Sequence, residues 1–232
     1  MTPGIPLPYL PSNDDWVAIT LVVCFLLSSY VLSRSRKFLL QLLKEFVLHR
    51  ERISLFAIAT ASDTRYLLLL IGQTCILSGI CLHCHFCSQH PELPLRVPSY
   101  LLLALYGGSV LLYVVCKWLL YTWTGWIFFD RQRRSLWIES YSTLLYYAGF
   151  TLFPFLLLLL YSCAGYANAL PIGIALLVLL KILTFYKWFK LFCSNLHGCS
   201  LLFLYFCTLE IVPCLVCFKG MGELTDYLII NF

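Results

Sequence analysis

Long apolar stretches alternate with short polar turns along this chain of 232 residues. A helix needs about 20 mostly apolar residues to cross a hydrocarbon core about 30 Å thick. The stretches approach this length and lack the period-two alternation of a barrel strand. Backbone groups in lipid must be hydrogen-bonded within a helix or a closed barrel, so the pattern predicts an all-α polytopic integral membrane protein. Six spans are predicted, at about 16–32, 66–86, 99–118, 137–162, 170–186 and 200–218.

The segments outside these spans have different patterns. Residues 1–15 hold four prolines, two acids and no basic residue, so the first apolar run is not preceded by the positive region of a signal peptide. Residues 36–59 place polar and apolar side chains on opposite sides at helical spacing, which predicts an amphipathic helix lying in the cytoplasmic interface. Residues 16–218 are predicted to form one transmembrane domain, and residues 219–232 a C-terminal tail.

Composition and charge support this topology. Hydrophobic residues make up 61% of the chain and charged residues 12%, against roughly 45–50% and about 25% in soluble domains. The net charge of +5 does not indicate a nucleic-acid surface, because the basic residues cluster in turns. Fourteen of the sixteen Lys and Arg residues fall on one side of the six-span scheme, and Arg96 and Lys219 on the other. Since basic loops stay cytoplasmic, both termini are predicted to lie outside.

The end of the third predicted span is rich in aromatic residues. Lys117 is expected to snorkel toward the membrane interface if the helix continues past residue 118. The aromatic residues that follow are typical of a membrane-interface belt; they are Trp118, Tyr121, Trp123, Trp126, Phe128 and Phe129.

Glu210 is the main candidate for a functional residue, because a carboxylate inside a span is costly unless it is paired, protonated or in contact with water. Counted along antiparallel helices, its depth differs from that of Lys181 by less than the length of a lysine side chain, which predicts an intramembrane pair. Pro213 breaks the helix nearby and leaves the Leu209 carbonyl without its usual donor. The carboxylate is therefore either structural or part of an ion or proton path.

A second cluster combines cysteine and histidine in the pattern Cys-x-x-Cys-x-x-Cys with interleaved His. Its residues have metal-ligand chemistry, but the second distant Cys pair of a zinc ribbon is missing. A metal site, a disulfide and incidental clustering of buried cysteines all remain open. The candidates are Cys81, His83, Cys84, His85, Cys87 and His90.

Motifs for catalysis and cofactor binding are absent. The sequence has no Gly-rich phosphate loop, no nucleophile elbow and no His-Glu-x-x-His helix. We therefore expect no catalytic residue and no cofactor.

The C-terminal third contains Lys187-Trp188-Phe189-Lys190, then His197, then Leu204-Tyr205-Phe206-Cys207-Thr208-Leu209-Glu210-Ile211-Val212-Pro213. This order resembles the family of multi-spanning bacterial membrane proteins known as domain of unknown function 4271, found chiefly in Bacteroidota. The resemblance implies an inner-membrane protein of a Gram-negative envelope. It assigns no activity and no catalytic residues.

Three functions are left open. The leading hypothesis is a non-enzymatic subunit or scaffold of an inner-membrane assembly, whose partners are the lipid bilayer and candidate inner-membrane proteins, with no nucleic acid. The first alternative is a small transporter or proton-coupled carrier that uses Glu210. The second is a metal or redox membrane protein that uses the cluster from Cys81 to His90.

Overall fold

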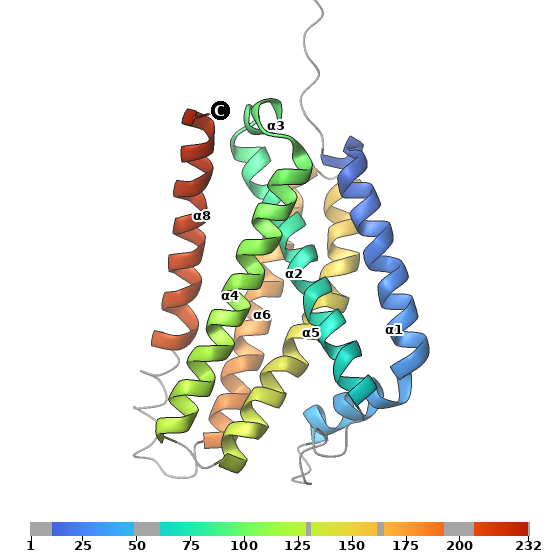
Figure 1. Ribbon diagram of the computed structural model, residues 1–232, viewed down its shortest axis with the longest axis vertical. Helices are drawn as coiled ribbons and strands as arrows, with labels where there is room; N and C mark the ends of the chain where they lie inside the picture. Colours follow the sequence, from blue (N-terminus) through green and yellow to red (C-terminus); the bar gives the residue numbers. More distant parts are fainter. Residues whose placement is uncertain (1–10, 49–60, 129–130, 162–164, 193–206, 232) are drawn as a thin grey trace, which may run out of the picture.

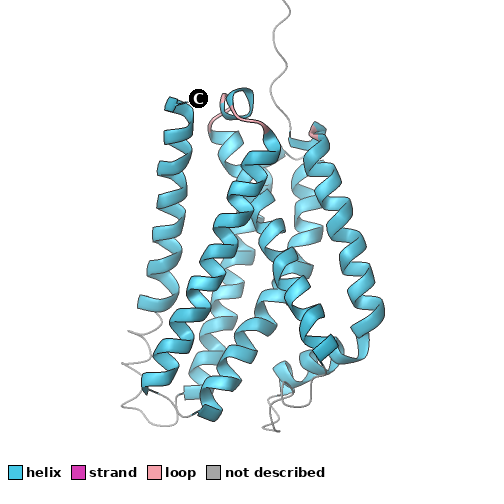
Figure 2. Cartoon of the chain, viewed as in Figure 1, coloured by secondary structure: helices cyan, strands magenta, loops and turns pink. Residues whose placement is uncertain are grey.

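A computed structural model describes residues 11–48, 61–128, 131–161, 165–192 and 207–231. These residues are helical apart from short turns, with no strand among them (Figure 2). The elements, in chain order, are the 3-10 turn η1 (Pro11–Asn13), α1 (Asp15–Leu48), α2 (Ala61–Gln89), α3 (Leu93–Arg96), α4 (Ser99–Phe128), α5 (Arg131–Tyr161), α6 (Gly165–Phe192), the π-helical turn η3 (Cys207–Ile211) and α8 (Val212–Asn231).

The long helices run up and down in alternation. In Figure 1, α1 descends from the upper end, α2 rises, α4 descends, α5 rises, α6 descends and α8 rises. The short helix α3 joins α2 to α4 at the upper end, beside the end of α8. The start of α1 and the end of α8 therefore lie at the same end of the bundle, as the predicted even number of crossings requires.

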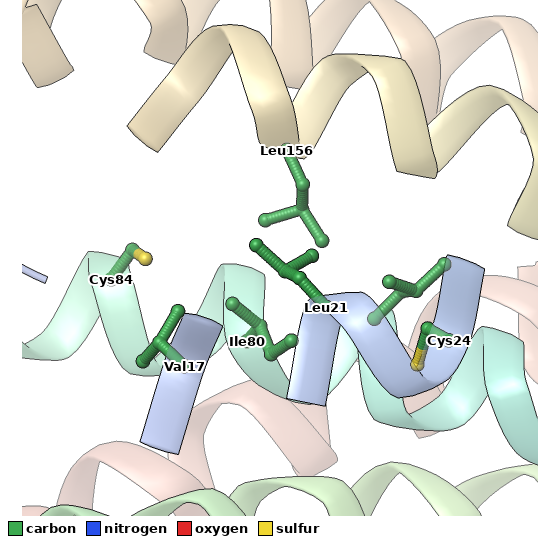
Figure 3. Close-up of a cluster of buried hydrophobic side chains, with 7 residues drawn as sticks. Val17, Leu21, Cys24, Ile80, Cys84 and Leu156 are labelled. Atoms are coloured by element: carbon green, nitrogen blue, oxygen red, sulfur yellow. The ribbon is translucent and has the colours of Figure 1, made fainter. Parts of the chain in front are cut away.

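Helix α2 is the centre of the bundle. It packs against α1, α4 and α5, and 56% of its apolar span is buried, compared with 11% for α6. Figure 3 shows one of its contacts, a buried cluster in which Ile80 of α2 lies near Leu21 of α1 and Leu156 of α5, with Cys84 and Val17 beside them. Helix α6 packs mainly on α5 and exposes most of its apolar side chains. In a membrane protein such outward apolar surface contacts lipid.

Two glycines set the distance between α2 and α4. A Cβ atom added to Gly79 of α2 would lie 2.7 Å from the backbone nitrogen and from Cα of Gly107 on α4. Only a residue without a side chain fits there, because backbone atoms cannot move aside as a flexible side chain can. A Cβ atom added to Gly107 would meet nothing within 4 Å. Glycine is therefore required at position 79 but not at position 107. Small residues at this contact allow α2 and α4 to approach closely.

Helix α1 bends at Ser35, whose backbone angles of φ −117° and ψ 18° are not helical. Beyond the bend the helix turns across the lower end of the bundle in Figure 1 and continues to Leu48. This agrees in position with the first half of the amphipathic helix predicted at 36–59. The second half of that prediction lies largely outside the described residues, and its place in a membrane interface stays a prediction.

Five helices in the described residues are long and apolar enough to cross a membrane; they are Asp15–Arg36, Arg65–Gln89, Ser99–Ile127, Ser140–Tyr161 and Ala169–Lys187. These correspond to the first five predicted spans. The sixth prediction, 200–218, lies partly outside the described residues.

Residues 219–231, predicted as part of a C-terminal tail, continue helix α8 to Asn231. The three charged residues after Phe218 ended the apolar run, but they are compatible with a helix because Lys219, Glu223 and Asp226 share one outward stripe.

Substituting Gly79 with Ala should destabilise the bundle, whereas Gly107→Ala should be tolerated. The added methyl group at position 79 forces α2 away from α4, and overpacking of this kind typically costs about 1–3 kcal/mol. Thermal unfolding of both purified variants in the same detergent measures the difference. Equal unfolding temperatures for the two variants would contradict the close helix contact.

Candidate functional site

Glu210 lies in η3, the π-helical turn that precedes α8. Pro213 stands three residues later and has no backbone N–H to donate to the carbonyl of Leu209. The regular α-helical hydrogen-bond pattern is therefore interrupted beside Glu210. Single π-helical turns often occur at functional sites because they reposition side chains relative to a regular helix. Here the turn directs Glu210 toward α4 and α6.

The Glu210 carboxylate accepts hydrogen bonds on both oxygens. Lys117 of α4 and Lys181 of α6 both donate to Oε2, and the Lys181 Nζ–Oε2 distance is 2.6 Å. The hydroxyl of Tyr121, one turn after Lys117, donates to Oε1. Lys181 Nζ also lies 3.4 Å from the backbone carbonyl oxygen of Glu210. We call Glu210, Lys117, Lys181 and Tyr121 the polar centre.

Aromatic rings from α4 and α5 surround the polar centre. The ammonium of Lys117 lies 5.2 Å from the ring centroid of Tyr141 and 5.7 Å from that of Tyr113, within the range of cation–π attraction. The ring of Tyr121 packs edge-on against Trp137, with centroids 5.2 Å apart. These rings keep water away from Lys117, and their faces weakly attract its positive charge.

Burial differs sharply within the polar centre. The side chains of Glu210 and Lys117 are 1% and 4% exposed, while that of Lys181 is 35% exposed. The first pair is thus inside the protein, and Lys181 reaches it from the outer surface of α6. In a low-dielectric interior each of these charges depends on the others for compensation.

When both lysines are protonated and Glu210 is ionised, the polar centre carries a net positive charge. Two ammonium groups face one carboxylate, because Glu210 is the one carboxylate that pairs with either lysine among the described residues. Glu210 is therefore the group that keeps the two lysines together. Without it, they would repel each other at short range.

The sequence predicted the pair of Glu210 and Lys181, and the structure places them in contact. It did not predict Lys117 or Tyr121. Lys117 does not snorkel toward the interface as expected, because a buried carboxylate lies within its reach. Tyr121 is buried and is not part of an aromatic belt, whereas Trp123 and Trp126 face outward and are 65% and 73% exposed. Helical spacing supplies the missed signal, since Tyr113, Lys117 and Tyr121 recur every four residues on one face of α4.

The structure does not bring the cysteine and histidine candidates together. Among the described residues, which include all six, no three His, Cys, Asp or Glu side chains are arranged to hold a metal ion. Cys84 packs in the core formed with α1, and Cys81 borders that core. His83 contacts Cys87 at 3.6 Å, on the side of α2 that meets α4.

The last two candidates point to α8. The ring of His85 lies 5.8 Å from that of Phe218, and Nε2 of His90 lies 3.9 Å from Asp226. Cys81, Cys84 and Cys87 are free thiols. At 3.6 residues per turn, a cluster spread over ten residues of one helix points in several directions. The structure does not assemble these side chains into one site, and the metal or redox hypothesis stays a prediction.

Two further contacts hold α8 near the upper end of the bundle. The hydroxyls of Tyr106 on α4 and Thr225 on α8 share a hydrogen bond of 3.0 Å, buried from solvent. Arg96 of α3 donates to the backbone carbonyl of Ile229 over 2.7 Å. Together with the polar centre, these contacts fix α8 side by side with α4 at both ends.

The all-helical bundle, its five apolar helices and its buried charges define a polytopic helical membrane protein. The model of the domain of unknown function DUF4271 matches residues 17–221. This match covers most of the chain, and the protein belongs to that family. Comparisons with curated proteins and with solved structures found no match.

Substituting Glu210 with Gln should destabilise the protein more than Lys181→Met does. The first change leaves the buried Lys117 and the partly exposed Lys181 without a counter-charge, and breaking a buried pair such as Lys117 and Glu210 typically costs about 3–5 kcal/mol. The second change leaves Lys117 and Glu210 as a neutral pair and removes one charged hydrogen bond, a loss of about 1–3 kcal/mol. Unfolding in a single detergent, followed by circular dichroism, measures both variants. A larger loss for Lys181→Met would contradict the role of Glu210 as the shared counter-charge.

Proposed function

We propose that this protein is a non-enzymatic subunit or scaffold of a bacterial inner-membrane assembly. In this role the polar centre joins α4, α6 and α8 into one rigid body that presents its outer helices to other membrane proteins. The observation that carries the proposal is the pairing of Glu210, whose two carboxylate oxygens both accept hydrogen bonds from side chains of the same chain. A carboxylate that is 1% exposed and bonded to donors from two other helices is suited to holding helices together.

The surroundings of the polar centre support a structural role. Proton paths through membranes usually use chains of acidic and histidine side chains. Among the described residues, two lysines and a tyrosine donate side-chain hydrogen bonds to Glu210, and tyrosine rings surround Lys117. Intramembrane ion pairs of this kind fix the relative position of helices, for which the lipid itself provides no hydrophobic driving force.

The proposed orientation places the lower end of the bundle in Figure 1 in the cytoplasm and both chain ends outside. Fourteen of sixteen basic residues support it, because positively charged loops are retained on the cytoplasmic side. Arg34 and Arg36 lie at the bend of α1, and Arg65 at the start of α2, all at this end.

A proton- or ion-coupled carrier is the second candidate. The exposure of Lys181 favours it, because 35% of that side chain is open at the surface of α6 while its ammonium touches the buried carboxylate. In such a carrier, Lys181 would connect Glu210 to the outside of the bundle as the protonation state changes.

Flux and assembly measurements distinguish the two functions. The protein is purified from its native membrane in mild detergent, and the wild type is compared with Glu210→Gln and with Lys181→Arg, which keeps the charge. A scaffold should retain co-purifying subunits in the wild type and in Lys181→Arg, and lose them in Glu210→Gln as α8 detaches. A Glu210→Gln variant that keeps its native complex size yet loses a cation flux in proteoliposomes would overturn the scaffold and establish the carrier.

Reporter fusions test the orientation independently. Fusions inserted at residues 49–60 and at residues 129–130 should both report a cytoplasmic location, because the described helix ends that flank both insertions lie at the lower end of the bundle in Figure 1. Fusions after Phe232 should report the opposite side. Opposite locations for the first two insertions would contradict the orientation.

A further inference from the structure

Helix α8 carries three exposed charged side chains, of which Asp226 lies near His90, just after α2, while Lys219 and Glu223 contact each other. The side chains of Lys219, Glu223 and Asp226 are 82%, 72% and 64% exposed. Their spacing of four and three residues places them on one helical stripe. The opposite stripe holds Met221 and Thr225, which are buried against the bundle. We call the first set the charged stripe.

The contacts between α8 and α4 fix the level of this stripe. Glu210 pairs with Lys117, and Thr225 pairs with Tyr106. Lys117 and Tyr106 both lie inside the apolar span Ser99–Ile127 of α4. Every residue of α8 between the two contacts is therefore level with the interior of that span.

Lys219 and Glu223 fall between these two contacts. Lys219 is six residues below Thr225, which is about 9 Å along the helix. It is nine residues above Glu210. Charges inside a membrane usually face the bundle interior or a water-filled cavity, because exposure to lipid is strongly unfavourable. Here they face outward. Their mutual contact is long, with 3.9 Å between Lys219 Nζ and Glu223 Oε1, and both side chains are largely exposed.

We propose that the charged stripe is the interface with a second copy of this chain. Copies inserted with the same orientation associate in parallel about a two-fold axis along the membrane normal. This symmetry brings Lys219 and Glu223 of one α8 beside the same two residues of its partner. Each lysine then lies within one turn of two carboxylates, and the four charges sum to zero.

The content of the stripe favours a copy of the chain as its occupant. In a parallel pair each Lys219 can reach the Glu223 of the partner, which lies one turn along the helix, so no other protein has to supply the opposite charge. Gly220 and Gly222 flank the stripe, and a Cβ atom added to either would meet nothing within 4 Å. Two helices can approach closely at such positions. The proposal deepens the assembly role, on which it rests, by naming one partner.

Charge reversal tests the interface. The wild type, Lys219→Glu, Glu223→Lys and the double reversal are purified in mild detergent, transferred to lipid nanodiscs and weighed by native mass spectrometry. The wild type should show twice the mass of one chain. Each single reversal places like charges together and should weaken dimerisation about tenfold or more. The double reversal restores the alternation of charges and should restore the dimer.

Two controls separate an interface effect from misfolding. Asp15→Asn removes an exposed charge at the start of α1, outside the stripe, so it should leave the dimer unchanged. Val216→Trp adds bulk on the same face as the stripe, where Val216 is 65% exposed, without changing charge. It should weaken the dimer even if the charge variants do not fold.

A monomeric wild type, a dimer indifferent to all of these changes, or a different protein bound at the stripe would overturn the proposal. A monomer that still co-purifies with other subunits overturns the dimer and leaves the proposed function intact. A dimer that loses cation flux with Glu210→Gln overturns the proposed function and leaves the dimer intact.

Discussion

The burial of one carboxylate between two lysines controls the arrangement of the C-terminal half of this protein. Glu210 is the group on η3 and α8 that reaches both α4 and α6, and it does so where lipid offers no compensation for charge. If Glu210 were apolar, α8 would have van der Waals contacts and the polar contacts near its upper end to hold it. Apolar surface gains little by leaving lipid for protein, so helix position in a membrane depends strongly on such polar contacts.

The same constraint explains why Lys117 and Tyr121 are buried in the middle of an otherwise apolar helix. A lysine in a span normally bends its stem toward water, and a tyrosine near a span end normally faces the interface. Here a counter-charge lies closer than the interface. The aromatic rings of Tyr141 and Trp137 then close the centre from the side of α5. Helices α4, α5 and α6 thus meet at one site. The sequence pattern alone predicts two of its side chains, Lys117 and Tyr121, at the membrane interface.

A consequence of fixing α8 at this site is the position of its charged stripe. The polar centre and the Tyr106–Thr225 contact hold α8 level with the apolar span of α4, and Lys219 and Glu223 come to lie inside that level. A helix so placed cannot present these groups to lipid at low cost. The polar centre, which positions α8, thereby also places charged side chains on the outer surface of the bundle, where a protein partner would compensate them.

The local pattern of the sequence determined a great deal. Apolar length predicts the five helices that are long enough to cross a membrane, the change of pattern after residue 36 predicts the bend of α1, and the depth of Glu210 predicts its pairing with Lys181. These features depend on the solvent or on distance along a helix, which composition and spacing encode directly. The tertiary structure decided the rest: that Lys117 joins the pair, that the cysteine and histidine side chains diverge, and that Lys219 lies level with the apolar span of α4. Each of these depends on how one helix is rotated and shifted against another, and that is set by contacts between residues distant in the chain.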